Sequence, residues 1–132
     1  MLVDFAALLL RFGLGVMFLA HGLQLAWGKL GGPGSAGFSK MLAGLGFSGP
    51  LFWAYVAGYT TLIGGACLLL GLYTRIAALL LIIFITVAAV KVHLSKGFFI
   101  MNGGYEYNFI IFIALLALIF LGAGKFAITK DL

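Results

Sequence analysis

Four long runs of apolar residues constrain this chain more than any other feature. A helix needs about 20 mostly apolar residues to cross a bilayer, and four stretches come close to or exceed that length: about 5–27, 51–72, 74–94 and the shorter 107–122. The runs are continuous rather than alternating, and strands in lipid would have to close into a barrel. The sequence therefore predicts an all-α integral membrane protein, a bundle of four transmembrane helices that forms a single membrane domain over residues 1–132.

The balance of apolar and charged residues points to the bilayer as the solvent. The chain is 64% hydrophobic and 8% charged, whereas a soluble domain is about half apolar and about a quarter charged. The formal net charge of +5 comes from basic residues scattered between the apolar runs. That pattern is typical of contacts with anionic lipid headgroups and lacks the continuous basic patch that nucleic acid requires. We expect membrane lipids as partners and no nucleic acid.

The loops predict how the spans are joined. Residues 28–35 are rich in glycine and break the first helix. The next apolar residues fall at i, i+3, i+4 and i+7, the spacing of one helical face: Phe38, Met41, Leu42 and Leu45. We predict a short interfacial helix there, after the first span. The second and third spans are joined by a very tight turn, which predicts an antiparallel hairpin with Gly71 as the helix-ending glycine.

Polar residues inside a membrane are costly, so each one is a candidate for function. Because successive spans alternate in direction, most of these residues fall at the level farthest from the chain termini. Thr60, Thr61 and Asn108 lie there, and so do the eight residues from which we predict a site: His21, Gln24, Tyr59, Lys91, His93, Tyr105, Glu106 and Tyr107. We predict that His21, His93 and Glu106 converge as a catalytic cluster. The other five, Gln24, Tyr59, Lys91, Tyr105 and Tyr107, are predicted to help bind a substrate.

Glu106 is the only acidic residue away from the ends of the chain. A carboxylate beside a span must be paired or protonated, and Lys91, His21 and His93 are the candidate partners. A histidine beside a glutamate can exchange a proton near neutral pH. A structural ion pair that pins the helices together would use the same residues, and both interpretations are open.

Two histidines also raise the question of a metal or haem site. Haem ligation by two imidazoles needs them to face each other across the ring, and the sequence contains neither Cys-x-x-Cys-His nor Glu-x-x-His. The single cysteine, Cys67, cannot form a redox pair or a four-cysteine site. We expect no metal centre.

A series of different short motifs spans nearly the whole chain. They are Arg11-Phe-Gly-Leu-Gly; Ala20-His21-Gly22-Leu23-Gln24 with Lys29; Ala57-Gly58 and Gly64-Gly65; Gly71-Leu72-Tyr73-Thr74-Arg75; His93 with Gly97-Phe98-Phe99; and Gly104-Tyr105-Glu106-Tyr107. In order and spacing they resemble the DoxX family of small four-span membrane proteins. Family members often carry a glutamate shortly before the Gly-Gly pair of the second helix, where this chain has Thr61.

The resemblance implies a function that the residues alone do not. Some DoxX proteins look like small subunits of membrane oxidoreductases that pass electrons from thiosulfate to quinone, and others are associated with quinone or thiol stress. It implies a quinone-linked oxidoreductase subunit in the bacterial cytoplasmic (inner) membrane, with quinone as the cofactor and a redox partner subunit that donates electrons. On this hypothesis His21, His93 and Lys91 donate hydrogen bonds to the quinone and Glu106 accepts a proton.

A second hypothesis treats the chain as a non-catalytic membrane module: an anchor, an assembly factor or a small-solute carrier. The polar cluster would then serve packing and docking, in line with the missing glutamate at Thr61. Four short helices enclose little volume, so a carrier would have to form a homo-oligomer. The sequence leaves both hypotheses open.

Overall fold

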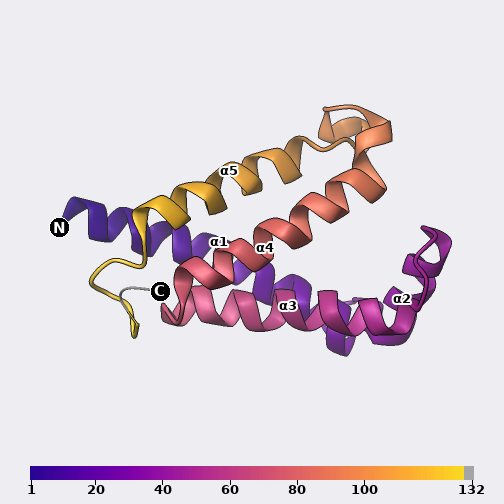
Figure 1. The fold of residues 1–132 in the computed structure, drawn as a ribbon, viewed down its shortest axis with the longest axis horizontal. Helices are drawn as coiled ribbons and strands as arrows, with labels where there is room; N and C mark the ends of the chain where they lie inside the picture. Colours follow the sequence, from indigo (N-terminus) through magenta and orange to yellow (C-terminus); the bar gives the residue numbers. More distant parts are fainter. Residues whose placement is uncertain (130–132) are drawn as a thin grey trace.

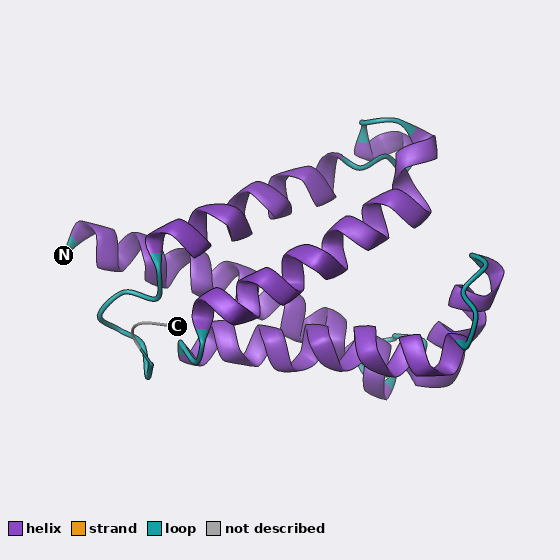
Figure 2. Ribbon diagram, in the orientation of Figure 1, coloured by secondary structure: helices purple, strands orange, loops and turns teal. Residues whose placement is uncertain are grey.

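The computed structural model describes residues 1–129, which form helices and connecting loops (Figures 1 and 2). The elements are α1 (Leu2–Trp27), α2 (Gly34–Gly44), α3 (Pro50–Leu70), α4 (Thr74–Ala88) and α5 (Glu106–Leu121). Beyond α4 the chain continues as a π-helix (Ala89–His93) and a 3-10 turn (Leu94–Lys96), and a second 3-10 turn (Ile100–Asn102) precedes α5.

The helices α1, α3, α4 and α5 run in alternating directions along the long axis of the bundle, which is horizontal in Figure 1. Met1 and the segment after α5 lie at one end of the bundle, which we call the terminal end. The loop 97–104 and α2 lie at the other, distal end. Three segments are long and apolar enough to cross a membrane: Leu2–Trp27, Pro50–Leu70 and Thr74–Lys96. The predicted all-helical membrane fold, with a short helix after the first span, is confirmed.

Several predicted boundaries differ from the structure. The second span ends at Leu70 because Gly71 adopts a left-handed conformation, with φ of 71°, as a helix-ending glycine does. The third span does not continue as an α-helix to residue 94 but changes to a π-helix at Ala89. The short helix α2 begins at Gly34, four residues before the apolar face that predicted it.

Close contact between α1 and α3 makes one rigid wall of the bundle. A Cβ atom added to Gly22 would lie 2.4 Å from backbone atoms of Leu62, and one added to Gly65 would lie 2.4 Å from the backbone nitrogen of Leu19. Small residues at such positions let two helix backbones approach directly, which is how helices associate in lipid.

Arg11 holds the terminal end together. Its side chain is only 1% exposed and donates four hydrogen bonds of 3.0 to 3.2 Å to backbone carbonyls. The acceptors belong to the end of α3 and to the segment after α5: Leu68, Leu69, Ala123 and Phe126. The last carbonyls of a helix have no partner within the helix, so the guanidinium satisfies groups that lipid could not.

The fourth helix is short, and the segment after it completes the terminal end. α5 has 16 residues, a length of about 24 Å at 1.5 Å per residue. The chain then folds back: the amide of Ile128 donates to the Leu70 carbonyl at 3.3 Å, and that of Thr129 to the Gly71 carbonyl at 3.0 Å. Non-helical backbone near lipid is tolerated where it is hydrogen-bonded to protein in this way.

The four-helix arrangement predicts that both chain ends face the same side of the membrane. Single cysteines introduced as Leu2→Cys and Lys125→Cys, in a Cys67→Ala background, should react with a membrane-impermeant thiol reagent from one common side. Met101→Cys, at a residue that is 95% exposed in the distal loop, should react from the opposite side. Labelling of positions 2 and 125 from opposite sides would contradict the bundle.

Replacing Arg11 should destabilise the protein far more than replacing Arg75, an exposed arginine that donates one hydrogen bond, to the Ile119 carbonyl. Arg11→Met removes a donor from four backbone carbonyls, of which that of Leu68 keeps the Gly71 amide as a partner, so we expect a loss on the order of 3 kcal/mol or more. Thermal unfolding in detergent, followed by circular dichroism, measures the difference. Equal melting temperatures for Arg11→Met and Arg75→Met would show that the carbonyl contacts are dispensable.

Candidate functional site

A cavity of about 810 Å³ lies at the distal end, between α1, α2, α3 and the α4–α5 hairpin. Most of its wall is aliphatic and aromatic, with Phe38, Leu42 and Phe47 contributed by α2 and the turn after it. The polar residues that line it come from four helical segments: His21, Thr60, Lys91, His93, Tyr107 and Asn108. Apolar cavities of about 300–1,000 Å³ with a few converging polar groups are the usual form of a small-molecule site.

His93 ends the π-helix and faces the cavity with a defined tautomer. Its Nδ1 lies 2.7 Å from the carbonyl oxygen of Gly103. A carbonyl can only accept, so Nδ1 carries the hydrogen, and Nε2 of the neutral ring is left as an acceptor. Short π-helical turns are rare and occur frequently at functional sites. The loop before α5 thus orients the His93 imidazole at the end of the π-helix.

Tyr107 contacts the α1 side of the cavity. Its hydroxyl donates to the sulfur of Met17 at 2.7 Å and lies 3.5 Å from Nε2 of His21. Tyr107 is half-buried and His21 is exposed, toward the cavity that both of them line. A hydroxyl between a thioether and an imidazole can turn its hydrogen toward either group, which gives α1 and α5 a polar contact at this level.

Lys91 supplies the positive charge at the cavity wall. Its ammonium lies 5.5 Å from the centre of the Phe47 ring, on the turn after α2. This distance is within the range of a cation–π interaction. The contact holds the lysine against the α2 side of the cavity while the side chain stays exposed.

Asn108 belongs to the cavity wall, although the sequence placed it only at the distal level and not among the predicted site residues. The residue is 4% exposed, and its Nδ2 donates to the carbonyl oxygen of Ile85 at 3.3 Å. Its Oδ1 is buried and has no partner in the structure. The available signal was an amide directly after Tyr107 at the start of an otherwise apolar helix.

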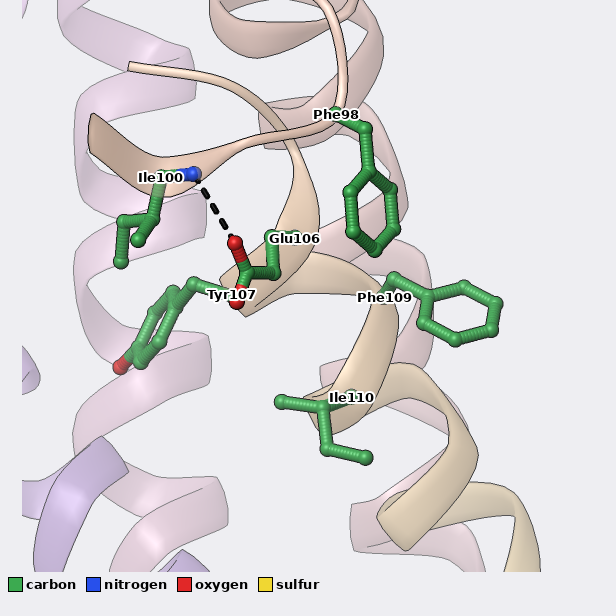
Figure 3. A pocket seen from close by; sticks show the side chains of 6 residues that line it. All are labelled: Phe98, Ile100, Glu106, Tyr107, Phe109 and Ile110. Atoms are coloured by element: carbon green, nitrogen blue, oxygen red, sulfur yellow. Dashed lines mark hydrogen bonds between the residues drawn. The ribbon is translucent and has the colours of Figure 1, made fainter. Parts of the chain in front are cut away.

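Glu106 does not share the cavity with the two histidines. It lines a neighbouring pocket of about 410 Å³ with Phe98, Ile100, Phe109, Ile110 and Tyr107 (Figure 3). Its Oε1 accepts a hydrogen bond of 3.1 Å from the backbone nitrogen of Ile100, and Figure 3 shows the Tyr107 hydroxyl pointing away from that loop. Among residues 1–129, the only ion pair joins the N-terminus to Asp4. The expected pairing of Glu106 with Lys91, His21 or His93 is therefore wrong.

Three further predicted binding residues also lie outside the cavity wall. Gln24 donates to the Leu30 carbonyl at 3.1 Å and supports the loop after α1. The hydroxyl of Tyr59 accepts from the indole nitrogen of Trp27 at 3.1 Å. The ring of Tyr105 packs edge-on against Phe98, with centroids 5.4 Å apart. The structure thus brings together His21, Lys91, His93 and Tyr107 of the predicted set.

Comparison with known proteins gives the family. The family model described as DoxX matches residues 6–94. This chain belongs to the DoxX family.

Two curated relatives of this DoxX protein span different shares of it. An uncharacterized protein of Haemophilus influenzae is 38% identical over 74 residues, 56% of this chain, and this chain spans about half (49%) of that relative's length. The putative oxidoreductase CatD of Bacillus subtilis is 29% identical over 120 residues, 91% of this chain and 81% of CatD. No solved structure matches.

This DoxX protein places no carboxylate at the position expected to hold the family glutamate. Thr61 is fully buried, and its hydroxyl donates within α3, at 2.8 Å from the Gly58 carbonyl and 3.2 Å from the Ala57 carbonyl. Since one hydroxyl hydrogen serves these two acceptors, Thr61 is engaged with its own helix. Within the described chain, no three His, Cys, Asp or Glu side chains are grouped as metal ligands would be.

Glu106 should stabilise the distal loop of this DoxX protein through its acceptor oxygen rather than through its charge. Glu106→Gln keeps an oxygen that can accept from Ile100, so we expect nearly unchanged stability. Glu106→Ala removes it and should cost about 1 kcal/mol and speed hydrogen exchange at the Ile100 amide. Equal exchange in the two variants would show that this hydrogen bond does not hold the loop.

Proposed function

We propose that this protein is a small membrane subunit that binds a quinone in the distal cavity and serves a quinone-linked oxidoreductase system. The observation that carries the proposal is the cavity itself: about 810 Å³, with an apolar wall and histidines from α1 and from the π-helix after α4. A quinone needs such a combination, because its ring and tail are apolar and its two oxygens need hydrogen-bonding partners.

Within this proposal the polar groups divide by helix. His21 and Tyr107, 3.5 Å apart, serve one side of the ligand headgroup. Lys91 and His93, from the π-helix after α4, serve the other. Imidazole is the side chain suited to exchanging protons near neutral pH, so His21 and His93 are the groups proposed to handle them.

The electrons have to come from elsewhere. Reduction of one quinone to hydroquinone takes up two electrons and two protons. The proposed source of the electrons is a redox partner subunit that oxidises a reduced sulfur compound of the thiosulfate type, and the histidines pass the protons. A relative from Bacillus subtilis that bears the name putative oxidoreductase supports this direction, and the bacterial relatives support a place in the bacterial cytoplasmic membrane.

Glu106 has a smaller part in the proposal than the sequence suggested. Its carboxylate accepts from the Ile100 amide in the neighbouring pocket, so the group proposed to pass protons to the ligand in its place is His93. The effect of Glu106→Gln on turnover distinguishes the two assignments. A loss of turnover of about 10²-fold, the usual scale for a general acid–base group, would assign the proton transfer to Glu106 instead of His93.

Quinone binding can be followed from inside the cavity, because Trp53 lines it and Trp27 does not. In a Trp27→Phe background, a short-chain benzoquinone should quench Trp53 fluorescence in a saturable way. Lys91→Met should weaken this binding about tenfold, the effect of losing one hydrogen bond from the ammonium to a quinone oxygen. Lys40→Gln, at an exposed position outside the cavity, is the matched control and should bind as the parent does. Quenching that never saturates would reject the quinone site and favour the non-catalytic module.

A further inference from the structure

We propose that the distal cavity holds the hydroquinone more tightly than the quinone, and that Asn108 makes the distinction. This inference rests on the proposed function and deepens it by naming the redox form that the site prefers. The two forms have nearly the same ring. They differ in their oxygens, because a hydroquinone hydroxyl can donate a hydrogen bond and a quinone carbonyl can only accept one.

The orientation of the Asn108 amide follows from its contact with α4. The Ile85 carbonyl, 3.3 Å away, can only accept, so the group facing it must be the NH₂ of the amide. The opposite orientation would place two acceptor oxygens against each other. The Asn108 oxygen is therefore the atom without a partner, and it offers an acceptor and no donor.

Burial makes this unpaired oxygen consequential. Buried side-chain oxygens nearly always have a hydrogen-bond partner, and the Asn108 oxygen has none and is closed off from water. Because Asn108 lines the cavity, the cavity's occupant can provide the missing donor by displacing the side chains that cover the oxygen. A hydroxyl there gains a full hydrogen bond with no competing water, whereas a carbonyl there would add a second unpaired acceptor.

The other polar groups of the cavity point the same way. His93 presents Nε2 as a second acceptor because Gly103 occupies its Nδ1 hydrogen. The hydroxyl hydrogen of Tyr107 is engaged by the sulfur of Met17 at 2.7 Å. The free donors include the Lys91 ammonium, which already contacts the Phe47 ring, and the ring N–H of His21, and both of these side chains are exposed. The acceptors are thus the less solvated groups, and they favour a ligand that donates.

Preference for the reduced form changes the energetics of the bound couple. Quinone takes up two electrons and two protons to become hydroquinone, so tighter binding of the product makes the bound quinone a stronger oxidant. A tenfold preference raises the two-electron potential by about 30 mV. The site would then accept electrons from a weaker reductant than the free quinone could.

The test measures the dissociation constants of both forms of one short-chain benzoquinone by anaerobic calorimetry on the full chain in detergent. We expect the hydroquinone to bind about tenfold more tightly, the effect of one hydrogen bond to an otherwise unpaired acceptor. Asn108→Leu should bring the ratio close to one while quinone binding changes little. Lys40→Gln, outside the cavity, should keep the parent's ratio.

A ligand variant keeps the test independent of the folding of Asn108→Leu. The dimethyl ether of the same hydroquinone has the ring and both oxygens but no hydroxyl hydrogen, so it should bind the native protein as weakly as the quinone. Equal affinity for quinone and hydroquinone, or tight binding of the ether, would overturn the preference and leave the quinone site standing. Failure of every form to bind would instead overturn the proposed function, and this inference with it.

Discussion

The contact on which the rest of the structure depends is that of the Arg11 guanidinium with four backbone carbonyls at the terminal end. A buried charge far from water requires compensation, and the partners of Arg11 in the described chain are carbonyl dipoles at the end of α3 and beyond α5 rather than a carboxylate. The charge therefore draws three segments together at one end of the bundle. Because α5 is short and its following segment is used in this closure, the α4–α5 hairpin is fixed mainly at the terminal end and diverges from α1 and α3 toward the distal end (Figure 1).

The distal cavity follows from that divergence and from the unequal stiffness of the two helix pairs. α1 and α3 touch backbone to backbone at Gly22 and Gly65, so their contact cannot widen without losing the packing that holds them in lipid. The hairpin opposite them is tied at its distal end by the contact of His93 with Gly103 and that of Glu106 with Ile100. With one wall rigid and the other held by its own loop, α2 covers the space between them and supplies part of its apolar lining.

The sequence predicted depth along the membrane well and rotation about each helix poorly. Hydropathy located the spans and the 3.6-residue period located α2, because both signals are carried by many residues together. Depth also grouped His21, Lys91, His93 and Tyr107 correctly at the distal end. Successive residues of a helix, however, point about 100° apart, so Glu106, Tyr107 and Asn108 share a depth but not a face. Only packing decides that Asn108 lines the cavity and Glu106 holds the loop. The π-helix that begins at Ala89 rotates the residues after it further, and the periodicity of the sequence did not predict that change.

The charge of the cavity wall limits what the site can do. The lining residues include Lys91, His21 and His93 but no aspartate or glutamate within the described chain, since Glu106 faces the neighbouring pocket and Thr61 stands where a family glutamate was expected. Such a wall disfavours a cationic ligand and suits a neutral one that gains negative charge, because fixed positive groups stabilise charge as it develops. A quinone gains negative charge in this way when electrons reach it before protons do. In this chain the missing carboxylate is therefore compatible with quinone chemistry in which the histidines of α1 and of the π-helix after α4 supply the protons.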